Sequence, residues 1–174
     1  MATEYAQELV KAMEYLAAKE DTLFLGQSMV HGGIAIAQSF SNIPVERRIE
    51  MPVAENLQLG LSTGLALSGY VPVSVYPRWN FLLLASDQLV NHLDKLCEMT
   101  SGAYSPKVII RVAVGVTKPV DPQEQHVGDF SEPYSKMLRN VKVVKLASAE
   151  QIIPAYKEAY ESSHSTILVE EHQF

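Results

Sequence analysis

Short, mostly apolar runs recur along this chain, and segments with helical periodicity separate them. Several of the runs are apolar throughout rather than alternating, which is expected of strands that helices cover on both faces. An alternation of such strands with helices favours a mainly parallel sheet between two helical layers. The sequence therefore predicts an α/β three-layer sandwich. The strand candidates are Thr22 to Gly26, Arg48 to Val53, Val71 to Tyr76, Lys107 to Val114, Val141 to Leu146 and Thr166 to Glu170.

The segments between these runs carry the spacing of helices. Glu4 to Lys19 has apolar residues on one face and acids and lysines on the other, as in an amphipathic helix. An irregular stretch, Gly115 to Phe130, contains two prolines and His126, and long loops of compact domains are often functional. Further helices are expected at about Gly33 to Phe40, Ala54 to Ser68, Phe81 to Ser101, Ser131 to Arg139 and Ala149 to Ser162.

Composition limits the class of protein. A chain of 174 residues with 47% hydrophobic content is the size of one domain, here residues 1–174. The net charge of -6 repels a phosphate backbone, so nucleic acid is not an expected partner. A single cysteine excludes an intramolecular disulfide, and neither a signal peptide nor a membrane-spanning stretch is visible. We therefore expect a cytoplasmic protein without a membrane partner.

Glu55 is the residue that most suggests chemistry. It lies at an expected strand-to-helix junction whose other residues are apolar or small. Desolvation disfavours the charged form of a carboxyl group, so a glutamate in such a setting can hold or deliver a proton. The alternative is an ordinary acid in the first turn of a helix, where the helix dipole favours it.

The surroundings of Glu55 form a longer pattern. Its parts are Pro52-Val53-Ala54-Glu55, a helix with spaced glycines, Gly69-Tyr70-Val71-Pro72-Val73, the triplet Trp79-Asn80-Phe81 and the segment ASDQLVNHLDK at 85–95. In order and spacing this pattern resembles the pyrimidine-binding domain of thiamine diphosphate enzymes. The resemblance is greatest to the beta chain of 2-oxo acid dehydrogenase decarboxylases and extends to transketolases. It runs from about Thr22 to Glu171 and implies the thiamin diphosphate-binding fold.

The resemblance implies roles for four residues. A glutamate at the position of Glu55 hydrogen-bonds the pyrimidine ring of the cofactor and favours the tautomer whose nitrogen deprotonates the thiazolium carbon. Phe81 occupies the position whose ring stacks on the pyrimidine, and Val53 lies beside the cofactor. His126 corresponds to a histidine that faces the substrate and transfers protons. Without the resemblance, Phe81 reads as a core aromatic and His126 as a solvated loop residue.

The diphosphate half of such a site is not visible in the chain. The family binds Mg²⁺ through a Gly-Asp-Gly segment and a downstream asparagine pair, but Gly128-Asp129 is followed by Phe130. The resemblance therefore implies thiamine diphosphate shared with a separate diphosphate-binding subunit, which holds the Mg²⁺, and no metal site in this chain. Pairing with a second copy of the chain is also implied. The expected activity, absent from the isolated chain, makes or breaks a carbon-carbon bond next to a carbonyl of a 2-oxo acid or ketose.

Three departures from the family pattern leave an alternative open. Gln27-Ser28 stands where dehydrogenase beta chains usually have two acids, and Val112-Ala113 replaces a Gly-Pro pair after Arg111. The chain also stops at Phe174, where family beta chains continue into a C-terminal domain, so no such domain is expected here. These differences suggest a non-catalytic regulatory or binding subunit with the same fold.

A competing motif is Gly60-Leu61-Ser62-Thr63-Gly64, which has the G-x-S-x-G form of a hydrolase nucleophile elbow. In hydrolases the serine occupies a tight turn directly between strand and helix. Here the motif lies inside a helical pattern, where small residues permit close packing. We therefore expect Ser62 to be structural.

Overall fold

The computed structural model describes residues 3–31, 35–115, 121 and 123–171. Its centre is a six-stranded sheet in the order β2-β1-β3-β4-β6-β5, in which all neighbouring strands are parallel. The predicted α/β sandwich is confirmed, with a sheet that is wholly rather than mainly parallel. The strands are β1 (Thr22–Gly26), β2 (Arg48–Glu50), β3 (Val71–Tyr76), β4 (Ile109–Val114), β5 (Lys142–Leu146) and β6 (Thr166–Glu171).

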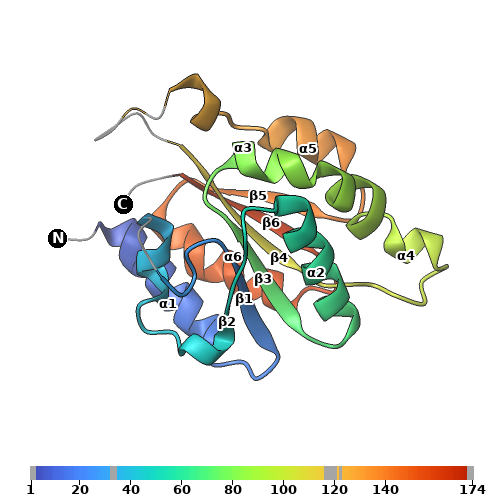
Figure 1. Cartoon of the computed structure of the whole chain (residues 1–174), viewed down its shortest axis with the longest axis horizontal. Helices are drawn as coiled ribbons and strands as arrows, with labels where there is room; N and C mark the ends of the chain where they lie inside the picture. Colours follow the sequence, from blue (N-terminus) through green and yellow to red (C-terminus); the bar gives the residue numbers. More distant parts are fainter. Residues whose placement is uncertain (1–2, 32–34, 116–120, 122, 172–174) are drawn as a thin grey trace.

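Helices cover both faces of the sheet (Figure 1). One face carries α1 (Glu4–Ala17), the 3₁₀ helix η1 (Ala35–Phe40) and α6 (Ala149–Glu161). The other carries α2 (Glu55–Leu67), α3 (Trp79–Leu82) and α5 (Ser131–Met137). The shorter elements are η2 (Val45–Arg47), η3 (Leu83–Ala85), η4 (Gln88–Leu93), α4 (Leu96–Met99) and η5 (Glu124–His126).

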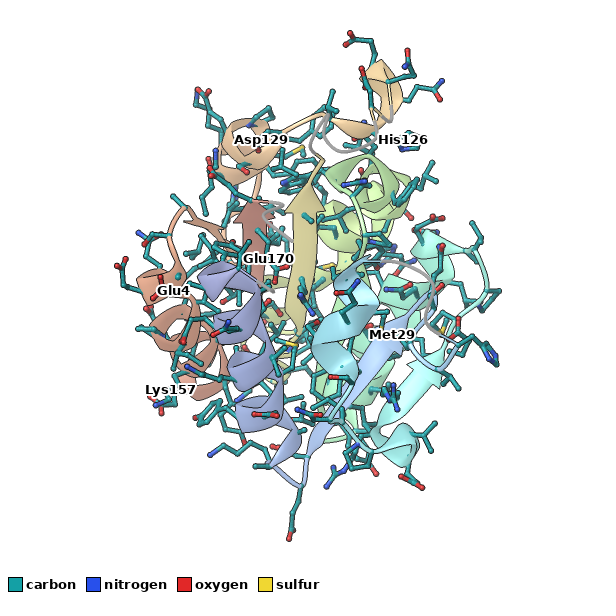
Figure 2. The ribbon with its side chains drawn as sticks, turned by 90° about the vertical axis from the view of Figure 1, so that its left-hand side faces the viewer. Glu4, Met29, His126, Asp129, Lys157 and Glu170 are labelled. Carbon is teal, nitrogen blue, oxygen red and sulfur yellow. The ribbon has the colours of Figure 1, made fainter. Side chains whose placement is uncertain are left out.

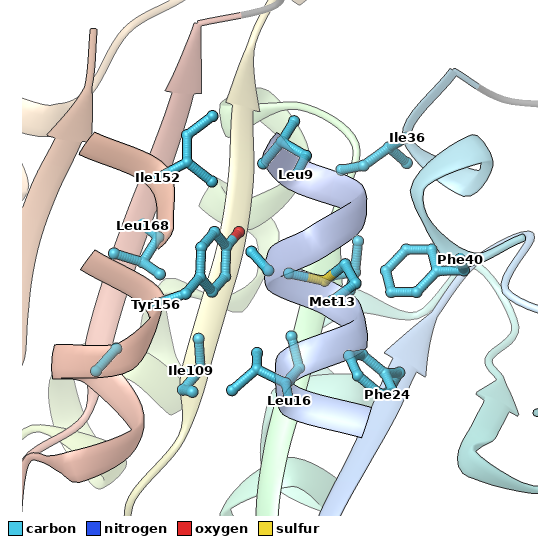
Figure 3. Close-up of a cluster of buried hydrophobic side chains, with 14 of the residues drawn as sticks. Leu9, Met13, Leu16, Phe24, Ile36, Phe40, Ile109, Ile152, Tyr156 and Leu168 are labelled. Atoms are coloured by element: carbon cyan, nitrogen blue, oxygen red, sulfur yellow. The ribbon is translucent and has the colours of Figure 1, made fainter. Parts of the chain in front are cut away.

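The core on the α1 face illustrates why these segments fold as they do. The apolar stripe of α1 packs between α6 and η1, where side chains from both helices and from the sheet interdigitate (Figure 3). Leu9, Met13 and Leu16 recur at helical spacing and are fully buried there. Burial of such side chains stabilises each by about 1.5–3 kcal/mol relative to exposure.

The expected single helix from Phe81 to Ser101 is wrong. The chain instead passes through α3, η3, a π-helical stretch at η4 and α4. The extra residue in the π turn lets Asp94 turn inward, and its amide donates to the carbonyl of Leu89 five residues earlier. Asp94 is buried, and one carboxylate oxygen accepts backbone N–H groups of Arg139, Asn140 and Val141. The interruption therefore binds this segment to the connection between α5 and β5.

The remaining differences are smaller. The strand expected to reach Val53 ends at Glu50, and η1 is a 3₁₀ helix rather than an α-helix. Residues 33 and 34 of that predicted helix lie outside the described part. Within the described residues, no helix is long and apolar enough to cross a membrane.

The strand order creates a switch point between β1 and β3. The chain leaves β1 toward η1 on one face of the sheet, whereas it leaves β3 toward α3 on the opposite face. In parallel α/β sheets, ligands bind in the crevice that forms beyond the carboxyl ends of two such strands. The fold thus points to the residues that follow β1 and β3.

Candidate functional site

Glu55 lies at this carboxyl edge as the first residue of α2. Its side chain is only 5% exposed, although the helix start receives no side-chain cap from Ala54. The Gln27 side-chain amide, directly after β1, donates to Glu55 Oε1 over 3.3 Å. The hydroxyl of Tyr76, at the end of β3, donates to the Glu55 backbone carbonyl, also over 3.3 Å. Gln27 therefore engages the carboxyl group next to the switch point, while Tyr76 fixes the backbone of the same residue.

The loop that carries Gln27 is fixed by Glu50. The carboxylate of Glu50 accepts the backbone N–H groups of Ser28, over 2.6 Å, and Val30, over 2.7 Å. Burial alone raises the pKa of Glu50, but these N–H donors outweigh it and hold the pKa below its ordinary value. Ser28 adopts a left-handed φ of 58°, which costs conformational energy that the two hydrogen bonds help to offset.

Phe81 and His126 are brought together from different parts of the chain. Their ring centroids are 5.4 Å apart with an interplanar angle of 65°, an edge-on contact. Phe81 belongs to α3, after β3, and His126 ends η5 in the crossover after β4. Figure 2 shows His126 at the end of the molecule toward which the strand arrows point. Both side chains are partly exposed.

Of the predicted site residues, the structure brings only Phe81 and His126 into contact with each other. Glu55 is paired with Gln27, and Phe81 with His126. Val53, between β2 and α2, is 78% exposed and packs little within this chain. Sequence reasoning noted Gln27 only as a departure from the family. Its contact with Glu55 depends on the crossing of β1 and α2, which no local pattern reveals.

Asp129 is engaged by residues of the same chain. Its carboxylate accepts the backbone N–H of Ser131 at the start of α5 over 2.9 Å and pairs with Lys145 over 2.8 Å. Burial works to raise the pKa of Asp129, but the Lys145 ammonium and Ser131 donors lower it overall. In the described part of the chain, no group of three or more His, Cys, Asp or Glu side chains is placed to hold a metal ion.

Ser62 is not placed as the nucleophile of a hydrolase would be. It is fully buried in the interior of α2, and its hydroxyl donates to the carbonyl of Gln58 over 2.8 Å. A nucleophile elbow requires an exposed serine on a sharp turn between strand and helix. The structural interpretation of the G-x-S-x-G motif is confirmed.

Curated proteins similar to this chain include beta subunits of 2-oxo acid dehydrogenases. The beta subunit of 3-methyl-2-oxobutanoate dehydrogenase from Mycobacterium tuberculosis is 31% identical over 139 residues, covering 74% of this chain and 37% of that subunit. The mitochondrial beta subunit of the pyruvate dehydrogenase E1 component from Saccharomyces cerevisiae is 27% identical over 164 residues, covering 90% of this chain and 43% of that subunit. The chain thus spans less than half of either relative. No protein-family model matches it.

Solved structures share the fold. A split-gene transketolase, described as an inactive β4 tetramer, superposes with a TM-score of 0.70 at 18% identity over 98% of this chain and 50% of that one. Transketolase from Campylobacter jejuni also gives a TM-score of 0.70, at 15% identity, over 97% of this chain and 25% of that one. The chain is like the pyrimidine-binding domain of thiamine diphosphate enzymes. Over most of its length it is a distant homologue of the beta subunits of 2-oxo acid dehydrogenases, and it shares its fold with transketolase.

Proposed function

We propose that this chain is the pyrimidine-binding subunit of a split thiamine diphosphate enzyme, with residues 1–174 acting as one cytoplasmic domain. The observation that carries the proposal is the nearly buried carboxyl group of Glu55 beside the β1/β3 switch point, where only a long hydrogen bond from Gln27 engages it among the described residues. The homology to 2-oxo acid dehydrogenase beta subunits and transketolase favours a 2-oxo acid or a ketose as substrate.

The residues present fit the pyrimidine end of the cofactor. Thiamine diphosphate supplies a carbon nucleophile and an electron sink for making or breaking a bond next to a carbonyl. The Glu55 carboxyl group, whose Oε1 accepts from Gln27, would hydrogen-bond a ring nitrogen of the cofactor. Phe81 offers a partly exposed ring for stacking, and Val53 offers an exposed apolar side chain. His126, held edge-on to Phe81, can donate or accept a proton on the substrate side.

The diphosphate and its Mg²⁺ are assigned to a partner subunit. This assignment rests on the sequence, in which Gly128-Asp129 is followed by Phe130 rather than by the glycine of the resembled family's metal-binding segment. An exposed apolar surface, which we call the α2 face, consists of Val53, Leu57 and Leu61 together with Leu84 on the neighbouring η3. A permanent interface over such a surface buries on the order of 2,000 Å² or more around an apolar centre. We propose that the α2 face meets the diphosphate-binding subunit and that two copies of this chain pair within the assembly.

Coexpression with a candidate diphosphate-binding chain tests the proposal. Calorimetric titration with thiamine diphosphate and Mg²⁺ is expected to show tight binding by the copurified assembly and weak or no binding by the isolated chain. Native mass measurement is expected to give an even-numbered hetero-oligomer. Tight, stoichiometric cofactor binding by a monomer of this chain contradicts the split-site proposal.

A non-catalytic subunit of the same fold is the second candidate. The observation that favours it is Gln27, an amide rather than an acid against Glu55, together with a structural neighbour described as inactive. The two candidates differ in whether Glu55 affects proton exchange on the bound cofactor. An assembly that binds the cofactor equally well with and without the Glu55 carboxyl, and exchanges at the same rate, supports the non-catalytic role.

A further inference from the structure

Buried polar atoms without partners concentrate in three consecutive residues. Six such side-chain atoms occur among the described residues, and three of them are Arg78 Nη1, Trp79 Nε1 and Asn80 Oδ1. Folded proteins pair most buried polar groups, because an unpaired group loses its hydration without compensation. A run of unpaired groups is therefore unusual for a segment that serves only to connect β3 with α3.

These residues lie where the fold places ligands. Arg78 follows β3 beside the switch point and precedes α3 in extended conformation. Its Nη1 lies 3.3 Å from the position that a Cβ on Gly115, after β4, would occupy. That same Cβ would overlap the His126 carbonyl oxygen at 1.9 Å, so only glycine fits there. The Arg78 guanidinium, Gly115 and the backbone of His126 therefore converge at the carboxyl edge.

The charge of Arg78 has no counter-ion in the described part of the chain. None of the ion pairs found there includes it. Partial burial lowers the pKa of Arg78, and no neighbouring acid offsets the effect. A guanidinium has a planar fork of donors that matches a carboxylate or a phosphate in two parallel hydrogen bonds. An anion is therefore the ligand that this environment suits best.

We propose that Arg78 is a specificity residue that binds the anionic group, a carboxylate or a phosphate ester, of the substrate. This subsite rests on the proposed function for the choice of substrate, because 2-oxo acids carry the first group and sugar phosphates the second. Arg78 is only half-buried as a residue, so an anion can meet its guanidinium on the side that is not enclosed. Arg78 stands three residues before Phe81, and His126 contacts Phe81, so this anion lies near the aromatic pair.

The chain contains a single tryptophan, Trp79, a buried neighbour of Arg78 in sequence, so its indole N–H senses a change at this subsite through the adjoining backbone. Its indole N–H gives one cross-peak in a ¹⁵N-correlated NMR spectrum of the full, isolated chain. We would titrate that chain at constant ionic strength with pyruvate and with ribose 5-phosphate, and with pyruvamide and ribose as neutral counterparts. Saturable movement of the peak is expected for at least one anion, with a dissociation constant on the order of 1 mM, and not for its neutral counterpart. The anion that produces it identifies the group as carboxylate or phosphate.

Variants make the assignment specific. Arg78→Gln is expected to weaken anion binding at least about tenfold, and Arg78→Lys, which keeps the charge but loses the fork, to weaken it less. Arg139→Gln, which removes a charge from an exposed site after α5, is the matched control and is expected to leave binding unchanged. Circular dichroism confirms that each variant is folded; should Arg78→Gln not fold, Arg78→Lys carries the comparison.

Two results overturn the proposal. One is equal movement of the indole peak with the anions and their neutral counterparts, or with none of them. The other is unaltered anion binding by Arg78→Gln or, in its place, by Arg78→Lys. Neither result bears on cofactor activation by Glu55, which is measured on the assembled enzyme, so failure of this subsite and failure of the proposed function are separable.

Discussion

Arg111 and Arg78 each have at least one buried guanidinium nitrogen, but they differ in whether the chain supplies hydrogen-bond partners for it. Arg111, in β4, is fully buried and donates to both carboxylate oxygens of Glu170 in β6, over 2.6 and 3.0 Å. Its third nitrogen donates to Ser39 in η1, and Tyr156 of α6 donates to Glu170. Arg78, at the carboxyl edge, has a buried nitrogen without any partner in the described chain.

This difference in partners distinguishes a structural arginine, Arg111, from a proposed ligand-binding arginine, Arg78. Burial works to lower the pKa of Arg111, but the Glu170 carboxylate more than offsets it and the pKa is raised. The pKa of Tyr156 is raised by burial and then by Glu170. Each charged or polar side chain of this network has a hydrogen-bond partner within the chain, so the role of the network is to join β4, β6, α6 and η1. Arg78, at the carboxyl edge, has no such partner for its buried nitrogen among the described residues, and we propose that a ligand supplies one.

The largest expected effect is on the scaffold. Arg111→Met leaves the Glu170 carboxylate buried without its counter-ion, and we expect the free energy of unfolding to fall by about 3–5 kcal/mol. Arg78→Gln removes a charge that has no partner, so a change below about 1 kcal/mol is expected. Urea denaturation of both variants measures the two values. Equal losses would remove the distinction between scaffold and site.

A double variant tests whether the stability lost by Arg111→Met comes from the unpaired charge of Glu170. Arg111→Met combined with Glu170→Met removes both charges, so neither is left uncompensated in the core. We expect the double variant to recover much of the stability lost by Arg111→Met alone. Additive losses would instead show that the two side chains act independently.

The second effect is on activity at the site. His126→Ala is expected to lower substrate turnover by roughly 10²-fold in the assembled enzyme while cofactor affinity changes little, because general acid–base groups contribute on this scale. Single-turnover kinetics and cofactor titration separate the two quantities. His164→Ala, at an exposed position before β6, is the control. Unchanged turnover in His126→Ala would make the contact with Phe81 merely structural.

A smaller effect concerns the loop that positions Gln27. Because the folded-state pKa of Glu50 is below its ordinary value, its stabilising contribution is present above the unfolded-state pKa and is lost as pH falls through the folded-state pKa. Glu50→Gln is expected to cost about 1 kcal/mol at neutral pH, since the site is partly solvated, and to remove this part of the acid sensitivity. Hydrogen exchange at Ser28 and Val30 between pH 7 and 3 measures it. Identical exchange in both proteins contradicts the assignment.

Much of the fold was predictable because its signals are local. The apolar runs at Thr22–Gly26 and Val71–Tyr76 are strands with the predicted bounds, since strands covered on both faces are hydrophobic throughout. The error at Phe81 to Ser101 came from treating helical spacing as continuous. Asp94 interrupts the helix because three backbone N–H groups from a segment some 45 residues away need an acceptor. No local pattern contains that requirement.

The candidate site was predictable only in part. Glu55, Phe81 and His126 were proposed from the resemblance of a longer pattern to a known family, and the structure brings Phe81 and His126 into contact. The hydrogen bond from Gln27 and the unpaired state of Arg78 depend on which strands are neighbours at the switch point. The sequence shows an arginine between Pro77 and Trp79, but only the structure shows that one of its nitrogens is buried without a partner.

We propose that Glu55 activates a cofactor rather than merely starting a helix. Hydrogen–deuterium exchange at the thiazolium carbon of thiamine diphosphate, bound to the assembly of this chain with its diphosphate-binding partner, measures that role. Glu132 is the matched control, because it is an exposed acid in the first turn of α5. We predict that Glu55→Gln slows exchange by roughly 10²-fold or more with assembly intact, while Glu132→Gln exchanges at the wild-type rate. Wild-type exchange in Glu55→Gln would show that Glu55 is only an acid at the start of a helix.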